Sequence, residues 1–127
     1  MKGSYVMKVS GTIILDEKKT TSFLVMKEKP ITFPSIEELD ESKTALGVIL
    51  NYYLDVIGIN PDLLRLEELS MVHKGDMKQN LFVFSINSKV TDVKAACAAT
   101  KLLEFTDVKQ LQGLFNTVEI DMAPFFS

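Results

Sequence analysis

The chain has 127 residues, of which 46% are hydrophobic, and its formal net charge is -3 at pH 7. This length and apolar content predict a single domain over residues 1–127 with one hydrophobic core. The acidic balance excludes an overall electrostatic attraction to nucleic acid or to an anionic membrane, so there is no strong nucleic-acid signal. A net negative charge is still compatible with a local basic patch.

The cysteine content and the N-terminal pattern predict where the protein resides. The single cysteine, Cys97, cannot form an internal disulfide, which favours a reducing compartment. Lys8, Ser10 and Gly11 interrupt the N-terminal apolar residues, so the segment is unlike a signal peptide. No stretch reaches the ~18 apolar residues of a membrane span. We therefore expect a soluble cytoplasmic protein with no membrane partner.

The N-terminal third predicts two strands and an extended segment. Residues 5–15 alternate loosely between apolar and polar side chains, and Thr20–Met26 is β-branched and apolar. The charged run 16–19 between them is typical of a solvated turn, which predicts a hairpin. Residues 31–34 are expected to be extended, because the residue before a proline avoids the helical region. Residues 35–42 are expected to form a loop.

A long helix is expected over residues 43–57. Asp40 or Ser42 is the predicted N-cap, and the acidic residues nearby suit the positive end of the helix dipole. The run contains no breaker except Gly47, and Gly58 supplies a C-terminal stop. Its apolar residues leave only a thin polar stripe, which predicts that other elements cover the helix on most sides.

The second half of the chain predicts mainly strands. Residues 63–72 fit a strand or a short helix, and a strand is favoured for their second half. After a turn at 73–76, residues 80–87 form a clear strand, so we expect a second hairpin. A short strand over 102–106 is expected to lead into a short helix over 107–116.

This order of elements resembles the Nudix hydrolase family over nearly the whole chain. Thr32-Phe33-Pro34 stands where the family has its Phe-Pro-Gly-Gly entry, and Gly58-Ile59 stands where its signature helix ends. The segment LLEFTDVKQLQGL, residues 102–114, looks like the family's late aromatic strand and helix. The resemblance implies an α/β (α+β) fold, a Nudix-like α/β/α sandwich with a mixed β-sheet.

The signature helix of this family carries its chemistry. Carboxylates three and four residues apart project from one helical face, where they hold divalent cations that bridge a pyrophosphate. The metals polarise phosphoryl oxygens and orient or activate water. Counted back from Gly58, the arginine position is Asn51 and the first glutamate position is Tyr52. The next two glutamate positions are Asp55 and Val56, so only Asp55 keeps a carboxylate.

The resemblance also implies a set of site residues. Glu41, in Asp40-Glu41-Ser42, looks like the family's loop glutamate, while Ser35-Ile36 replaces the paired glycines. An insertion leaves Glu37 and Glu38 as alternatives for that loop position. The implied catalytic and metal-binding residues are Asp55 and Glu41, and the implied ligand-binding residues are Phe33, Asn51 and Tyr52. The implied cofactor, if the protein is active, is Mg²⁺ or Mn²⁺.

This set of ligands is poor for a hard dication. Such an ion usually takes several oxygen ligands, and the helix offers only Asp55. Tyr52 and Val56 also make the surroundings more apolar, where an unpaired charge is costly. We therefore expect metal-dependent hydrolysis to be lost or severely weakened. Asp55 is as well explained as an exposed polar residue of a mostly buried helix as it is as a remaining metal ligand.

Three functions remain open from the sequence. The first is a domain with lost or weak metal-dependent pyrophosphohydrolase activity that binds a nucleotide-like ligand or a protein partner. The second is an active Nudix hydrolase of a nucleoside diphosphate linked to another moiety, with a displaced metal site that uses Asp55, Glu41 and either Glu68 or Glu104. The third is a structural homodimer formed by the apolar helix and the Phe125-Phe126 tail.

Other reactive or aromatic side chains have ordinary interpretations. Tyr52 or Tyr53 offers a face for a nucleobase, but packing is the commoner role of such residues. His73 is expected to be a surface histidine, because the chain has no second histidine that would complete a zinc site. Cys97 is expected to be a small packed residue.

Overall fold

The computed structural model describes residues 7–17, 20–27, 31–38, 42–74, 77–87, 89–116 and 118–119. The strands are β1 (Met7–Glu17), β2 (Thr20–Met26), β3 (Ser35–Glu38), β4 (Leu64–Lys74), β5 (Met77–Ile86), β6 (Leu103–Asp107) and β7 (Val118–Glu119). The helices are α1 (Ala45–Ile57), α2 (Val90–Ala98) and α3 (Gln112–Phe115), with 3-10 turns η1 (Pro61–Leu63) and η2 (Val108–Gln110). These elements form the predicted mixture of helices around a sheet.

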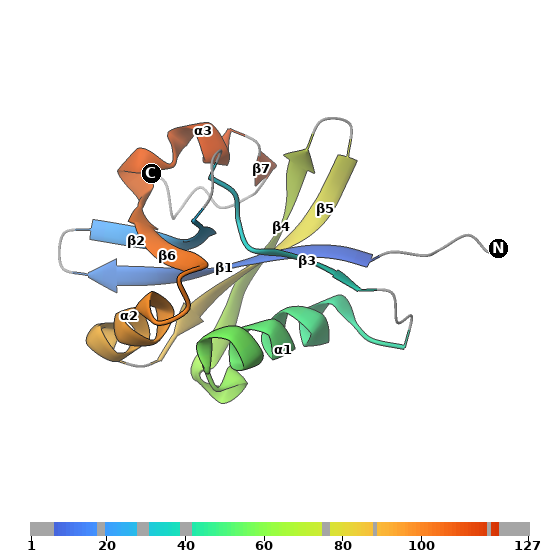
Figure 1. Cartoon of the computed structure of the whole chain (residues 1–127). Helices are drawn as coiled ribbons and strands as arrows, with labels where there is room; N and C mark the ends of the chain where they lie inside the picture. The colour runs from blue at the N-terminus through green and yellow to red at the C-terminus, as the bar shows by residue number, and fades with distance from the viewer. Residues whose placement is uncertain are drawn as a thin grey trace.

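The strands form one mixed, seven-stranded sheet (Figure 1). Its order is β6-β2-β1-β5-β4-β7, and β3 pairs with β1 off this path. β1 and β5 are parallel, and the other pairs are antiparallel. Both predicted hairpins, β1 with β2 and β4 with β5, are confirmed. The long strand β1 lies at the centre, because it pairs with β2, β3 and β5.

Helices cover both faces of this sheet. Figure 1 shows α1 and α2 on one side of the strands and α3 on the other. Alternation along β1 divides its side chains between the two layers. Val9 and Ile13 pack with the α1 residues, whereas Ile14 packs with Leu111 and the α3 segment. The sheet therefore separates an α1 face from an α3 face.

Local signals set the two ends of α1. Thr44 is the N-cap, because its backbone is extended and its side chain accepts a hydrogen bond of 3.0 Å from the Gly47 amide. The predicted caps were therefore wrong: Ser42 lies before the cap, and Asp40 lies outside the described residues. The predicted stop is confirmed, because Gly58 adopts a left-handed φ of 78° and its amide bonds to the Leu54 carbonyl.

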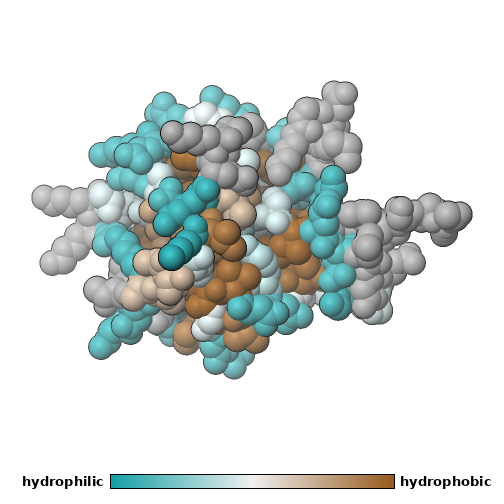
Figure 2. Space-filling view, in the orientation of Figure 1, coloured by the Kyte–Doolittle hydropathy of each residue, from teal (hydrophilic) through white to brown (hydrophobic). Residues whose placement is uncertain are grey.

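One side of α1 packs on the sheet and the other meets solvent. Ile49, Tyr53 and Ile57 are buried, whereas Asn51 and Asp55 are exposed. Figure 2 shows apolar residues at the surface along α1 and between it and α2. The exposed residues of α1 are Asn51, Leu54 and Asp55, and its other residues are buried or partly buried. The prediction that neighbours cover α1 on most sides is therefore largely right.

Gly11 permits the close approach of α1 to β1. A Cβ atom at this position would lie 2.5 Å from Ile49 Cγ1 and 2.8 Å from Tyr53 Oη. Real Cβ atoms essentially never show separations this short, so a larger residue at position 11 requires Ile49, Tyr53 or the backbone to shift. A glycine in a strand often marks such an approach.

The structure differs from the prediction at two segments, residues 35–38 and residues 107–116. Residues Ser35–Glu38 form β3 rather than a loop, because they pair antiparallel with the first residues of β1. The helix predicted over 107–116 is divided at Leu111 into η2 and α3. Asp107 caps η2, since its Oδ1 accepts a 2.8 Å bond from the Lys109 amide. None of the helices in the described part of the chain is long and apolar enough to cross a membrane.

The packing at Gly11 predicts a stability effect. Gly11→Ala should lower the free energy of unfolding by about 1–3 kcal/mol, the usual cost of overpacking a core. Urea denaturation measures this change. Gly113→Ala is the matched control, because a Cβ there meets nothing within 4 Å, and it should leave stability unchanged or slightly raised. Equal midpoints for the two variants would contradict the close packing of α1.

Candidate functional site

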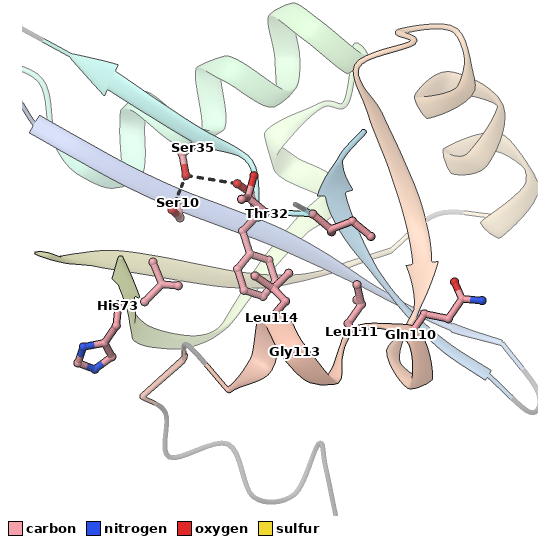
Figure 3. Close-up of a pocket in the computed structure, with 11 residues that line it drawn as sticks. Ser10, Thr32, Ser35, His73, Gln110, Leu111, Gly113 and Leu114 are labelled. Carbon is pink, nitrogen blue, oxygen red and sulfur yellow. Dashed lines mark hydrogen bonds between the residues drawn. The ribbon is translucent and has the colours of Figure 1, made fainter. Parts of the chain in front are cut away.

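A cavity of about 390 Å³ lies between the sheet and the η2–α3 segment (Figure 3). Its volume falls within the range of about 300–1,000 Å³ that is usual for ligand sites. Strands β1, β3 and β4 supply one side, and η2, α3 and the segment before β3 supply the rest. The lining residues are Ser10, Ile31, Thr32, Phe33, Ser35, Val72, His73, Gln110, Leu111, Gly113 and Leu114.

The wall of the cavity is mainly apolar and is held by aromatic packing. Phe33 and Leu111 are buried in the cluster on the α3 face. The Phe33 ring packs against Phe115, with 5.8 Å between the ring centroids. Phe115 in turn meets Phe23 of β2 edge-to-face at 4.9 Å. These contacts fix the short helix α3 over the sheet and so keep the cavity open beside it.

A small polar cluster consists of Ser10 and Ser35, which line the cavity, and of Gln79 behind them. The two serine oxygens lie 2.7 Å apart, and Gln79 Nε2 donates to Ser10 Oγ and, at 3.1 Å, to Ser35 Oγ. The Ser35 hydroxyl also donates to the Phe33 carbonyl at 3.3 Å. Ser10 is fully buried, whereas Ser35 is exposed. Ser35 is therefore the member that a ligand can reach, and the other two hold it from behind.

Two further polar residues lie at the rim. His73 of β4 is half-buried, so the prediction of a simple surface histidine was only partly right. Figure 3 shows the side chains of His73 and Gln110 directed away from the centre of the cavity. The cavity centre is consequently apolar, with hydrogen-bonding groups at its margin.

The structure divides the site residues that the resemblance implied. Asn51 and Asp55, four residues apart, share the exposed face of α1. Tyr52 is half-buried beside Tyr53, with 6.0 Å between their ring centroids. Phe33 lies in the cluster on the opposite face of the sheet. Phe33 therefore does not converge with Asn51 and Tyr52, and the assignment of these residues to one site stays a prediction.

The described carboxylates do not form a divalent-metal site. Glu41 lies outside the described residues, and among those described no group of three or more His, Cys, Asp or Glu side chains could hold a metal ion. Glu68 is on β4 and Glu104 is on β6, four strands apart in the sheet. At about 4.8 Å per strand, this separates them by roughly 19 Å. One ion cannot bind both.

Burial dominates the electrostatics of the remaining reactive groups. Burial raises the pKa of Tyr53 well above its ordinary value, and Tyr52 adds to this effect. Burial also raises the pKa of the Cys97 thiol to about 11, with Lys27 lowering it and Glu104 raising it. Cys97, on α2, is neutral at physiological pH and belongs to the core cluster on the α1 face, which confirms the predicted packed residue.

The sequence did not predict the polar cluster of Ser10, Ser35 and Gln79. Ser10 and Gln79 are 69 positions apart, and neither belongs to a local motif. The available signal was a serine in the apolar strand 5–15, which indicates a buried hydrogen bond. The partner of that serine depends on strand pairing, which periodicity does not reveal.

Comparisons with known proteins agree with the fold. No protein-family model matches the sequence, and no curated protein matches it significantly. The structure is similar to that of NrtR from Shewanella oneidensis, with a TM-score of 0.59, 12% identity, and coverage of 85% of this chain and 55% of that chain. NrtR complexed with a 27mer DNA gives a TM-score of 0.58 and 9% identity, covering 84% and 53%. This chain spans about half the length of the NrtR chains.

A third similar structure has nearly the same length as this chain. The Ap4A hydrolase of C. elegans gives a TM-score of 0.56 and 10% identity, covering 87% of this chain and 86% of that chain. NrtR and this hydrolase are Nudix-fold proteins. Identities this low show the fold alone. The chain therefore has the Nudix-like α/β/α sandwich with a mixed sheet that its sequence predicts.

Proposed function

We propose that this Nudix-like domain has lost or weak metal-dependent pyrophosphohydrolase activity and binds a nucleotide-like ligand in the cavity between the sheet and α3. The observation that carries the proposal is the cavity itself. It has the size of a ligand site, and it lies across the sheet from the helix on which the family's metal chemistry is built.

The composition of α1 supports the loss of hydrolysis. Its only carboxylate is Asp55, which is exposed and has Asn51 as its neighbour on the same face. A single exposed carboxylate binds a hard dication weakly, because such an ion needs several oxygen ligands. We propose Mg²⁺ or Mn²⁺ as a cofactor only for any hydrolytic activity that remains.

The chemistry of the cavity supports a nucleobase-like ligand. Phe33, Leu111 and Leu114 supply apolar surface that suits the faces of a flat heterocycle. The accessible Ser35 hydroxyl supplies a hydrogen-bonding group for its edge. Among the described residues, those that line the cavity include no lysine or arginine, so the phosphate groups of a nucleotide would extend away from them.

The alternative function is an active hydrolase with a displaced metal site. Asp55 is accessible enough to take part, and the roughly 19 Å between the strands of Glu68 and Glu104 allows only one of these two glutamates to join it. This alternative and the proposal differ in one measurable property, which is metal-dependent turnover.

A turnover assay decides between them. The full chain is incubated with Ap4A and with other nucleoside diphosphate derivatives, with Mg²⁺ or Mn²⁺, and products are separated by chromatography. We expect little or no turnover and no change in Asp55→Asn, because a lone carboxylate does not assemble the metals. Metal-dependent turnover that Asp55→Asn abolishes would establish the active hydrolase instead.

A binding experiment tests the cavity. Leu114→Trp should fill part of the cavity and weaken binding of adenosine monophosphate by about tenfold or more in calorimetry. Gln112→Trp is the matched control, because it adds the same side chain to an exposed position of α3 that does not line the cavity. Equal affinities for the two variants would place the nucleotide elsewhere, and an absence of binding by the unmodified chain would reject the nucleotide-like ligand.

A further inference from the structure

The polar cluster beside the cavity contains a closed set of hydrogen bonds (Figure 3). Four contacts join its groups: Ser10 Oγ to Ser35 Oγ at 2.7 Å, Gln79 Nε2 to each serine oxygen, and Ser35 Oγ to the Phe33 carbonyl at 3.3 Å. Each contact needs one proton, and the Phe33 carbonyl supplies none. The number of protons therefore decides which group donates to which.

The side-chain amide of Gln79 must supply two of these protons. Each serine hydroxyl carries one proton and an amide NH2 group carries two, so the three side chains provide one proton for every contact. If the amide were turned over, its oxygen would face both serines, and the two hydroxyl protons alone would have to serve all the contacts. Gln79 and Ser10 are buried, where a missing hydrogen bond is costly. Gln79 therefore donates to both serines.

The same count leaves one arrangement for the two hydroxyl groups. The Ser35 proton points to the Phe33 carbonyl, because that carbonyl can only accept. The contact between the two serines is then made by the proton of Ser10. Ser35 Oγ accepts from both Ser10 and Gln79, which occupies both of its lone pairs. Ser35 can consequently offer a further group only its proton.

The bond that Ser35 donates is also the one that a ligand most easily replaces. Its length of 3.3 Å exceeds the usual length of about 2.7–2.8 Å for a bond between a hydroxyl group and an oxygen. Ser35 lines the cavity and is exposed. A ligand acceptor can take this proton at small cost, whereas a ligand donor meets an oxygen whose lone pairs are occupied.

We propose that the cavity selects a flat heterocycle that presents a hydrogen-bond acceptor, such as an unprotonated ring nitrogen, over one that presents only a donor. Ser35 is the donating residue, and Ser10 and Gln79 are positioning residues that fix the direction of its proton. The proposal rests on the proposed function, because it takes the cavity as the site of a nucleobase-like ring. Adenine meets the requirement through its ring nitrogens.

Two uncharged two-ring heterocycles test this selection. Quinoline has a ring nitrogen that accepts a hydrogen bond, and indole has a ring N–H that donates one. Each is titrated at neutral pH into the isotopically labelled full chain, and the NMR shifts of the amides around the cavity give its affinity. We expect quinoline to bind about fivefold more tightly than indole, which is the usual effect of one hydrogen bond.

Three variants show whether the polar cluster causes this preference. Ser35→Ala should abolish it, because quinoline loses its donor. Ser70→Ala is the matched control and should keep it, because in the described structure the buried Ser70 Oγ has no hydrogen-bond partner and Ser70 does not line the cavity. Gln79→Glu should reverse it, because a carboxylate draws both serine protons to itself and leaves Ser35 a lone pair for indole. A merely structural role of Gln79 would weaken both ligands alike.

The outcomes separate this proposal from the proposed function. Equal affinities of the unmodified chain for quinoline and indole, no binding of either ring, or a preference that survives Ser35→Ala would overturn the selection by Ser35. A preference for quinoline that Ser35→Ala abolishes would support it, even if adenosine monophosphate does not bind. That last result would reject only the nucleotide-like ligand. If Gln79→Glu does not fold, the comparison of Ser35→Ala with Ser70→Ala still decides.

Discussion

The close packing of α1 on β1 at Gly11 is the contact on which the rest of the arrangement depends. Ile49 and Tyr53 occupy the space that a side chain at position 11 would need. Once this contact fixes which side of β1 faces α1, alternation sends Ser10 and Ile14 to the other face. Tyr53 is fully buried here, and in the described structure its hydroxyl has no hydrogen-bond partner. Such a group costs free energy, so the surrounding apolar packing must outweigh it.

This division places the implied site residues on different faces of the sheet. The face of α1 that carries Asn51 and Asp55 points to solvent, whereas Phe33 lies beneath α3. Most residues of α1 are apolar, and Ile49, Tyr53 and Ile57 pack it on the sheet. The cavity on the α3 face depends on aromatic contacts of Phe115 and on the Ser10–Ser35–Gln79 cluster, and neither requires a metal ion.

The sequence predicted those features that depend on neighbouring residues. The apolar, β-branched run gave the bounds of β2, and Gly58 gave the end of α1, because both signals are local. Pairing between distant segments was not predictable in this way. Strand β3 exists because Ser35–Glu38 pairs with β1, and the bulge near Glu67 exists because β4 pairs with β5. The cavity needs both the β1–β3 pairing and the docking of α3, so its polar cluster could not be found from spacing alone.

An NMR titration that locates any binding of adenosine monophosphate is the most direct test of the proposed function. Adenosine monophosphate is titrated into the isotopically labelled full chain, and backbone amide shifts are followed by NMR. The account predicts that shifts concentrate at Thr32, Ser35 and Leu114, around the cavity. Shifts concentrated at Asn51 and Asp55 would contradict it, because the ligand would then bind on the exposed face of α1.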